Sequence, residues 1–252
     1  MLEISHVSVS CGGMDILSDI SVTFPKENIT TIVGPNGCGK TTLLQTLNGT
    51  SKVTAGKIYL DDRDYMAIRP KERARNLSFM PQVRTNIPCI SVQSLVEHGR
   101  FPYLGFARKK NAKDVEIVGK AMDFTGVSKY ATQSVDTLSG GIRQRVFLAM
   151  QLAQDCDYMV LDEPTTYLDL PGQRKMLSLI QELKKQKKTL ILVLHDLNQA
   201  LSVSDYIVVM KERKIVTVDT PGNLTANHVL EEVFDCNMRP VELPDKTQYL
   251  FW

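Results

Sequence analysis

Gly34-Pro35-Asn36-Gly37-Cys38-Gly39-Lys40-Thr41 is the stretch that decides the fold, because it matches the pattern G-x-x-x-x-G-K-[ST]. The residues before it, 29–33, form a compact β-branched run that predicts a buried strand. The residues after it, 41–48, have the leucine spacing of a helix. Glycines let successive backbone N–H groups point inward, and the helix N-terminus adds the positive end of its dipole. This order of elements predicts a phosphate-binding loop rather than a chance glycine turn.

The polar side chains of the loop predict its ligands, ATP and Mg²⁺. Lys40 can reach the β- and γ-phosphates, and the Thr41 hydroxyl can take one position on Mg²⁺. Cys38 is either a redox switch or a small side chain tolerated where only the backbone binds phosphate, and we favour the second interpretation. The nucleotide-binding residues expected here are Gly34, Pro35, Asn36, Gly37, Cys38, Gly39, Lys40, Thr41 and Thr42.

Two acidic residues, Asp162 and Glu163, end the apolar stretch 158–161, which predicts a strand. In a fold built around a phosphate loop, the neighbouring strand delivers an aspartate to the Mg²⁺ shell, and Asp162 has that position. Glu163 is placed to polarise a water for attack on the γ-phosphate. Such a pair taken alone is more often a solvated turn, but the phosphate loop upstream favours the catalytic interpretation.

Composition narrows the class of protein. With 30 basic and 28 acidic residues, the net charge of +2 is too small to indicate a nucleic-acid partner. The basic cluster 184–188 is better explained as a solvated helix C-terminus than as a binding patch. Five cysteines without CxxC pairing predict a reducing cytoplasm and no disulfide framework or zinc site. No signal peptide is expected, and no apolar run reaches the ~18 residues that span a bilayer, so a membrane role requires a partner.

Strands alternate with helices along most of the chain, which predicts an α/β fold with a mostly parallel sheet. A further strand pair is expected near 57–60 and 77–81. We place a catalytic α/β core with a β subdomain at 1–86 and 157–220, and a helical subdomain at 87–156. The tail, 221–252, is expected to hold one short helix at 226–234 and an irregular end.

The stretch Thr137-Leu138-Ser139-Gly140-Gly141-Ile142-Arg143-Gln144-Arg145 opens another helix. A serine cap followed by two small residues leaves helix N–H groups available, which again suits phosphate. One protein rarely needs two distant helix N-termini on one triphosphate. A second subunit presenting this helix across an interface explains the arrangement, so Ser139, Gly140 and Gly141 are expected to act in trans.

Leu138-Ser139-Gly140-Gly141, just before the Asp162-Glu163 strand, resembles the signature of the ATP-binding cassette (ABC) ATPases, and the likeness runs from residue 2 to about 222. Gln82 resembles the Q-loop residue, Leu168-Asp169 the D-loop, and His195 the switch histidine. A lone histidine is more often structural, but in this order His195 is interpreted as a sensor of the γ-phosphate.

The resemblance implies a P-loop NTPase (RecA-like) fold with an N-terminal antiparallel β subdomain and an inserted helical subdomain. It also implies a head-to-tail homodimer with two ATP molecules between phosphate loop and signature. Gln82, Glu163 and His195 would be catalytic, and Thr41, Gln82 and Asp162 would hold Mg²⁺. The chain would lie peripherally at the cytoplasmic face of the cell membrane and drive integral-membrane permease subunits.

Two positions depart from the family pattern. The aromatic residue that usually stacks on adenine is replaced by Cys11, which cannot stack. The usual glutamine after the signature is Ile142, which removes a side-chain donor but leaves the backbone N–H groups. Neither change removes a catalytic residue.

Three stretches look like the ATPases of importers for metal chelates such as ferric siderophores, haem and cobalamin, which also use a substrate-binding protein. They are residues 96–103 (VEHGRFPY), 162–169 (DEPTTYLD) and 195–200 (HDLNQA). In the first stretch, Gly99, Arg100 and Pro102 have an alternative explanation, since they would also end a helix and turn the chain. The alternatives for the whole chain are an exporter ATPase, a soluble ABC ATPase, a non-hydrolysing regulatory module, and a GTPase or small kinase. Of these, the GTPases and small kinases lack the signature.

Overall fold

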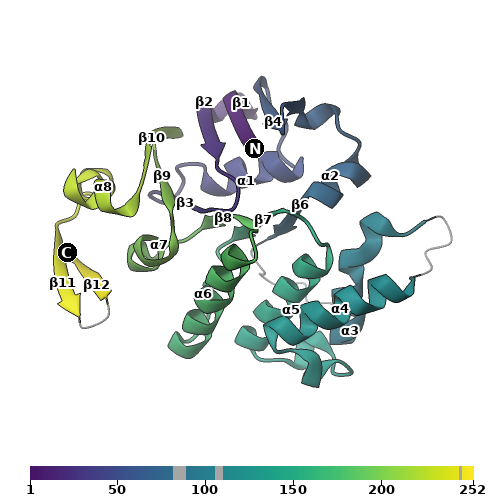
Figure 1. Cartoon of the computed structure of the whole chain (residues 1–252). Coiled ribbons are helices and arrows are strands. Elements are labelled where there is room, and N and C mark those ends of the chain that lie inside the picture. The colour runs from purple at the N-terminus through teal and green to yellow at the C-terminus, as the bar shows by residue number, and fades with distance from the viewer. Residues whose placement is uncertain (82–88, 106–109, 244–245) are drawn as a thin grey trace. The chain divides into compact units, whose positions relative to one another are not determined.

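The computed structural model describes residues 1–81, 89–105, 110–243 and 246–252. The chain forms two compact units, one from residues 1–66 and 191–252, the other from residues 67–190 (Figure 1). The phosphate loop and the C-terminal tail belong to the first unit. The acidic strand end and the signature belong to the second.

The first unit contains most of the strands and the C-terminal helices. Its elements are β1 (Leu2–Cys11), β2 (Met14–Phe24), β3 (Ile29–Val33), α1 (Lys40–Asn48), β4 (Ala55–Leu60), β5 (Arg63–Asp64), α7 (Leu197–Val203), β9 (Tyr206–Lys211), β10 (Lys214–Asp219), α8 (Pro221–Ala226), α9 (Val229–Phe234), β11 (Met238–Leu243) and β12 (Lys246–Phe251). Strand β8 (Thr189–Val193) enters this unit from the second and is buried along its whole length.

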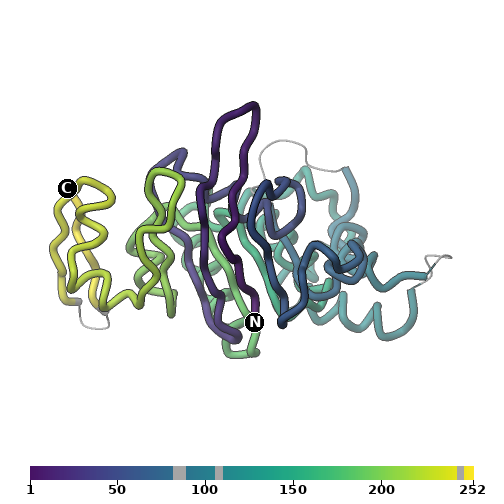
Figure 2. Tube along the Cα trace, turned by 90° about the horizontal axis from the view of Figure 1, so that it is seen from above, coloured from purple at the N-terminus to yellow at the C-terminus, as the bar shows by residue number. Residues whose placement is uncertain are grey.

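The N-terminal residues form an antiparallel sheet with the strand order β2-β1-β4-β5. Leu2 lies opposite Phe24 on one side and opposite Leu60 on the other. Apolar residues alternate with polar ones along β1, and the apolar side chains are the buried ones, as expected for a sheet with one face against a core. In Figure 2, β1 and β2 form the long purple hairpin.

The strand that precedes the phosphate loop lies in a mostly buried sheet. β3 runs parallel to β9, with Thr30 opposite Tyr206, and β10 pairs antiparallel with β9. All five residues of β3 are buried, which fits its β-branched composition. The C-terminal end of β3 therefore delivers the loop to the start of α1 from a rigid base.

The second unit is largely helical. Its elements are α2 (Pro70–Asn76), β6 (Leu77–Met80), α3 (Val92–Glu97), the 3₁₀ segment η2 (His98–Tyr103), α4 (Ala112–Thr125), α5 (Gly140–Ala153), β7 (Tyr158–Asp162) and α6 (Leu170–Lys185). β6 and β7 are parallel, with Leu77 opposite Tyr158. Helices α3, α4 and α5 share one apolar core that includes Val96, Val118 and Val146. Among the described residues, no helix is both long and apolar enough to cross a membrane.

The α/β class with parallel strands, an antiparallel N-terminal sheet and helices is confirmed. The expected strand pair is wrong as a pair, because β4 pairs with β1 and β5 while β6 pairs with β7. The helical subdomain expected at 87–156 lies inside the second unit, which also holds β6, β7 and α6. The division of the chain into subdomains stays a prediction.

The expected irregular C-terminal end is also wrong. β11 and β12 form an antiparallel two-stranded sheet, with Met238 opposite Phe251 and Pro240 opposite Tyr249. Pro240 argues against a central strand, because proline cannot donate a hydrogen bond to a neighbouring strand. Both strands of a two-stranded sheet are edge strands, however, and edge strands tolerate proline. The one helix expected before this end is two, α8 and α9.

Candidate functional site

The phosphate loop lies between β3 and α1 in the first unit, and its glycines meet conformational demands. Gly37 and Gly39 have φ of 78° and 105°, in the region that side chains with a Cβ rarely adopt. A Cβ at Gly34 would lie 2.3 Å from the Met210 carbonyl oxygen. The close approach of β9 therefore requires glycine at position 34.

The electrostatics of this loop suit an anion. Lys40 is 7% exposed, and its Nζ donates to the carbonyl oxygens of Gly34 at 2.7 Å and Pro35 at 3.0 Å. Helix α1 starts without a side-chain cap and has no acidic residue in its first turn. Its N-terminal N–H groups and the buried ammonium thus face the same short loop, and Thr41 beside them is exposed. These residues fit a triphosphate, with the Thr41 hydroxyl available to Mg²⁺.

Cys38 packs beneath the loop. Its side chain is 4% exposed, and its Sγ lies 4.0 Å from the Lys40 Nζ. Sγ would also be 2.8 Å from a Cβ at Gly34, so a larger side chain has little room at position 38. This burial favours the packing interpretation of Cys38 over the redox switch.

The acidic pair lies at the end of β7 in the second unit. Asp162 ends the fully buried strand and is 3% exposed, and Glu163 is 8% exposed. Glu163 has φ of 53°, a left-handed conformation that is uncommon for a residue with a Cβ. The Thr166 hydroxyl donates to the Glu163 Oε2 at 3.1 Å, and the Thr166 N–H donates to the Glu163 carbonyl oxygen. A tight turn therefore holds the carboxylate in one orientation.

Thr166 is a residue whose part in the site the sequence analysis missed. The signal in the sequence is weak, since threonine hydroxyls close local turns only more weakly than Asn or Asp side chains do. Within the stretch 162–169, roles were expected for Asp162, Glu163 and Leu168-Asp169, whereas Thr166 had no role of its own.

The signature stretch starts α5 in the second unit. Ser139 occupies the N-cap position in an extended conformation, and its side chain makes no capping hydrogen bond. Ser139 and Gly140 are exposed, and a Cβ at Gly141 would meet nothing within 4 Å. The N–H groups that begin this 14-residue helix are thus accessible. A Cβ at Gly140 would lie 3.9 Å from the carbonyl oxygen of Tyr167, so the helix start lies beside the turn that follows Glu163.

The remaining site residues are distributed over the chain. His195 is exposed, between the end of β8 and the start of α7 in the first unit. Asp169 caps α6, because its Oδ1 accepts from the Gly172 N–H at 2.9 Å. Cys11 ends β1 and is exposed. Gln82 lies outside the described residues.

The first unit thus contains the phosphate loop and His195. In the second unit the start of the signature helix lies beside the turn that follows Glu163. The roles of all these residues stay predictions. Within the described part of the chain, no group of three or more histidine, cysteine or acidic residues is arranged to hold a metal ion by itself.

The stretch 98–103 contains two structural residues and one surface residue. A Cβ at Gly99 would lie 2.2 Å from the Met150 carbonyl oxygen in α5. Arg100 is 3% exposed, donates through Nε to Asp114 at 2.9 Å and through a terminal nitrogen to the Ala153 carbonyl oxygen at 2.8 Å. Phe101 is 53% exposed. Gly99 and Arg100 therefore pack η2 against α5.

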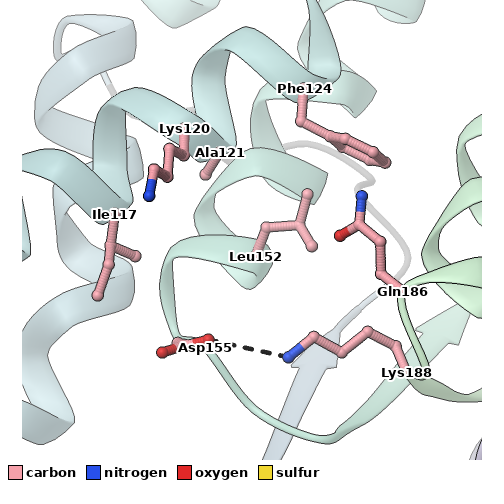
Figure 3. Close-up of a pocket in the computed structure, with 8 residues that line it drawn as sticks. All are labelled: Ile117, Lys120, Ala121, Phe124, Leu152, Asp155, Gln186 and Lys188. Atoms are coloured by element: carbon pink, nitrogen blue, oxygen red, sulfur yellow. Dashed lines mark ion pairs between the residues drawn. The ribbon is translucent and has the colours of Figure 1, made fainter.

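A cavity of about 430 Å³ in the second unit lies between α4, the end of α5 and the residues after α6 (Figure 3). Lys188 in its wall lies 3.8 Å from Asp155 and donates to the Cys156 carbonyl oxygen, and Lys120 pairs with Glu116. Burial raises the pKa of the nearby Cys156 thiol to about 12. The lysines already have acidic partners and the buried thiol stays protonated, so we assign no ligand to this cavity.

Comparison with known proteins gives a family match along more than half of the chain. The family model described as ABC transporter matches residues 17–166, which include the phosphate loop, the signature and the acidic pair.

Two curated relatives are similar over almost the whole chain. The iron(3+)-hydroxamate import ATP-binding protein FhuC of Bacillus subtilis is 36% identical over 96% of this chain and 91% of its own length. The ferric enterobactin transport ATP-binding protein FepC of Escherichia coli is 38% identical over 95% of this chain and 89% of its own length.

A similar solved structure is cbiO1 of Clostridium perfringens, part of the ABC transporter complex cbiONQ. It superposes with a TM-score of 0.79 at 26% identity and covers 92% of this chain and 93% of its own.

Proposed function

The chain belongs to the ABC transporter family, and on that premise we propose that it is the ATP-hydrolysing subunit of an importer that takes up an iron chelate. The observation that carries the proposal is the phosphate loop, where the buried Lys40 and the uncapped start of α1 face the same short backbone segment. The relatives named for iron-chelate import cover at least 95% of the chain and support the direction and class of transport.

The residues of the chain divide the work of hydrolysis. Lys40 and the N–H groups of the loop bind the phosphates, and Glu163 accepts a proton from the water that attacks the γ-phosphate. His195 contacts the γ-phosphate. Thr41, Gln82 and Asp162 are the residues that would hold Mg²⁺, which screens the negative charge of the phosphates.

The proposed active form is a homodimer at the cytoplasmic face of the cell membrane. Ser139, Gly140 and Gly141 of one subunit bind the γ-phosphate held by the loop of the other. The accessible N-terminus of α5 supports this arrangement. Closure on ATP and reopening after hydrolysis then move permease subunits, and a substrate-binding protein delivers the chelate to them.

The transported chelate is proposed only as a class. FhuC and FepC are named for a hydroxamate and for enterobactin, and this chain is about equally similar to both. An ATPase subunit acts on nucleotide and permease rather than on the solute. An iron siderophore is therefore the class that both relatives support, with an exporter as the alternative.

The decisive experiment measures ATP hydrolysis by the purified chain and by Glu163→Gln. We expect the variant to lose at least about 100-fold in kcat while it still binds ATP, because only the proton acceptor is removed. Glu182→Gln, at an exposed residue of α6, is the matched control and should hydrolyse at the normal rate. Equal rates for the wild type and Glu163→Gln would refute the enzymatic assignment.

The transport assignment has a separate test. Cells that lack the chain should lose uptake of a radiolabelled ferric siderophore and regain it with the wild type but not with Glu163→Gln. If cells that lack the chain take up ferric hydroxamate, ferric catecholate and haem normally, and instead accumulate a compound that the wild type exports, the exporter would be favoured.

A further inference from the structure

The C-terminal hairpin of β11 and β12 is attached to the rest of the first unit at two places. At its base, the Glu231 Oε1 of α9 accepts from the Met238 N–H at 3.0 Å, and Asn237 and Trp252 exchange backbone hydrogen bonds. Helix α9 itself buries Leu230 and Val233 and packs against β9. The hairpin is therefore linked to β9 through α9.

The second attachment is a two-bond clamp between α7 and β12. The Asn198 Nδ2 donates to the Tyr249 carbonyl oxygen at 2.9 Å, and the Asn198 Oδ1 accepts from the Tyr249 N–H at 2.7 Å. One side-chain amide thus pairs with both backbone groups of one strand residue, as a neighbouring strand would. Both bonds are partly buried, and together they fix the plane of the amide as well as its distance.

Helix α7 needs such support. It has seven residues, of which Ala200 and Val203 are buried. A helix this short is not stable by itself, since isolated helices need at least about 12 residues, so its position depends on contacts with the rest of the unit. The clamp at Asn198 is in the first turn of α7, where the chain arrives from His195.

His195 is coupled to this clamp through the chain. Three residues, 194–196, connect β8 to α7, and Asp196 caps the helix by accepting from the Gln199 N–H at 3.1 Å. Since β8 is buried along its length, one end of this connection is fixed. The other end follows α7, so a shift of the first turn of α7 moves His195.

We propose that the C-terminal hairpin positions His195 for catalysis by clamping α7 through Asn198 and Tyr249, an inference that rests on the proposed function of His195. Asn198 is a positioning residue, because both polar atoms of its side-chain amide bond the backbone of Tyr249. The hairpin thereby gives the tail of the chain a role in the catalytic step.

The test compares hydrolysis kinetics of Asn198→Ala, Asn198→Asp and Tyr249→Pro in the full-length protein. Asn198→Ala removes both bonds, and Tyr249→Pro removes the donor from the other side. Each is expected to lower kcat about fivefold to tenfold with the KM for ATP unchanged, as the loss of one or two hydrogen bonds predicts. Asn198→Asp keeps the acceptor for the Tyr249 N–H and should lie between Asn198→Ala and the wild type.

A double variant and a control complete the design. Asn198→Ala combined with Tyr249→Pro should be no slower than the slower single variant, because both break the same clamp. Ser202→Ala, at an exposed position of the same helix, should keep the wild-type kcat. A clamp that only stabilised the fold would instead lower the melting temperature without a selective change in kcat, and that result would overturn the inference.

The failure of this inference is distinguishable from failure of the proposed function. If the wild type hydrolyses ATP, His195→Ala does not, and Asn198→Ala keeps full kcat, then the clamp has no catalytic role and the proposed function stands. If the wild type and His195→Ala hydrolyse ATP at the same rate, the proposed role of His195 is wrong and the inference falls with it.

Discussion

Glu163 shows at the scale of one residue how the turn after β7 holds a side chain in place. Glu163 and Tyr167 both have positive φ, 53° and 63°, although neither is glycine. Such conformations cost about 1–3 kcal/mol each and persist where the surroundings enforce them, often at functional sites. The two hydrogen bonds from Thr166 are part of that enforcement. The turn therefore spends conformational energy to hold a nearly buried carboxylate in place.

Thr166→Val tests the hydroxyl at constant side-chain shape. Loss of a hydrogen bond to a carboxylate, worth about 1.5–3 kcal/mol, should lower kcat by about 10- to 150-fold and leave the KM for ATP unchanged. Steady-state ATPase kinetics measure the effect, with Thr132→Val at an exposed position as control. A wild-type kcat for Thr166→Val would show that the turn backbone alone orients Glu163.

The packing of η2 against α4 and α5 shows how elements of the second unit are held together. Arg100 joins all three, since its guanidinium meets Asp114 in the first turn of α4 and the last carbonyl of α5, and lies 4.0 Å from the centre of the Tyr103 ring. Asp114 also closes the capping box of α4 with Asn111. The pair is buried, so removing one partner leaves a charge without compensation.

Arg100→Met should lower the free energy of unfolding by about 3–5 kcal/mol, as expected for a broken buried ion pair.

Asp114→Asn should change how the free energy of unfolding depends on pH. The backbone N–H of Asn111, and then Arg100, lower the pKa of Asp114. The stability from Asp114 is therefore fully present above its ordinary pKa of about 3.9 and is lost as pH falls through the lowered value. Denaturant unfolding from neutral pH to about pH 3 should give Asp114→Asn a flatter acid limb, and parallel limbs would contradict this role.

Two glycines of the same unit make a matched pair. Gly99→Ala places a Cβ 2.2 Å from the Met150 carbonyl oxygen, and should push η2 from α5 at a cost of about 1–3 kcal/mol. Gly119→Ala lies in α4, where a Cβ meets nothing within 4 Å, and should stabilise by about 0.5–1 kcal/mol. The melting temperatures of both variants measure these opposite effects. Equal changes in melting temperature would mean that η2 can move away from α5 without loss of stability.

At the scale of the whole molecule, the first unit contains the phosphate loop and the second contains the acidic pair and the signature. The second unit also exposes large apolar side chains near these residues. Tyr167, whose carbonyl lies beside the accessible start of α5, is 81% exposed, and Leu170 at the start of α6 is 70% exposed. Exposed apolar residues beside a polar site are typical of an interaction surface. This supports the proposal that the site is completed by another copy of the chain.

The dimer makes a prediction for assembly. With ATP and Mg²⁺, Glu163→Gln should elute with the mass of two chains, because the nucleotide is bound but not hydrolysed. Adding Ser139→Arg should keep it monomeric, since a bulky side chain then covers the start of α5, whereas Thr132→Arg at an exposed position should not. Light scattering after size-exclusion chromatography measures the mass. A monomeric Glu163→Gln with bound ATP would contradict the proposed dimer.

Local chemistry explains what was predictable from the sequence. The loop 34–41 needs glycine where the backbone turns left-handed or approaches β9, and a lysine at the helix start, so its residues and spacing identify it without coordinates. The strand that ends in Asp162 and the α/β alternation were readable for the same reason, because burial and hydrogen bonding repeat at short range.

Only the tertiary structure decided the features that depend on partners far apart in the chain. Asn198 meets Tyr249 across 51 residues, and Gly99 meets a carbonyl of α5, contacts that leave no periodic signal in the sequence. The expected pairing of β4 with β6 was wrong for the same reason, because strand pairing depends on chain topology. The sequence by itself determined the phosphate loop, because its conformation depends on residues next to one another in the chain. The fold determined what supports the residues around it, because packing depends on residues that are far apart in the chain.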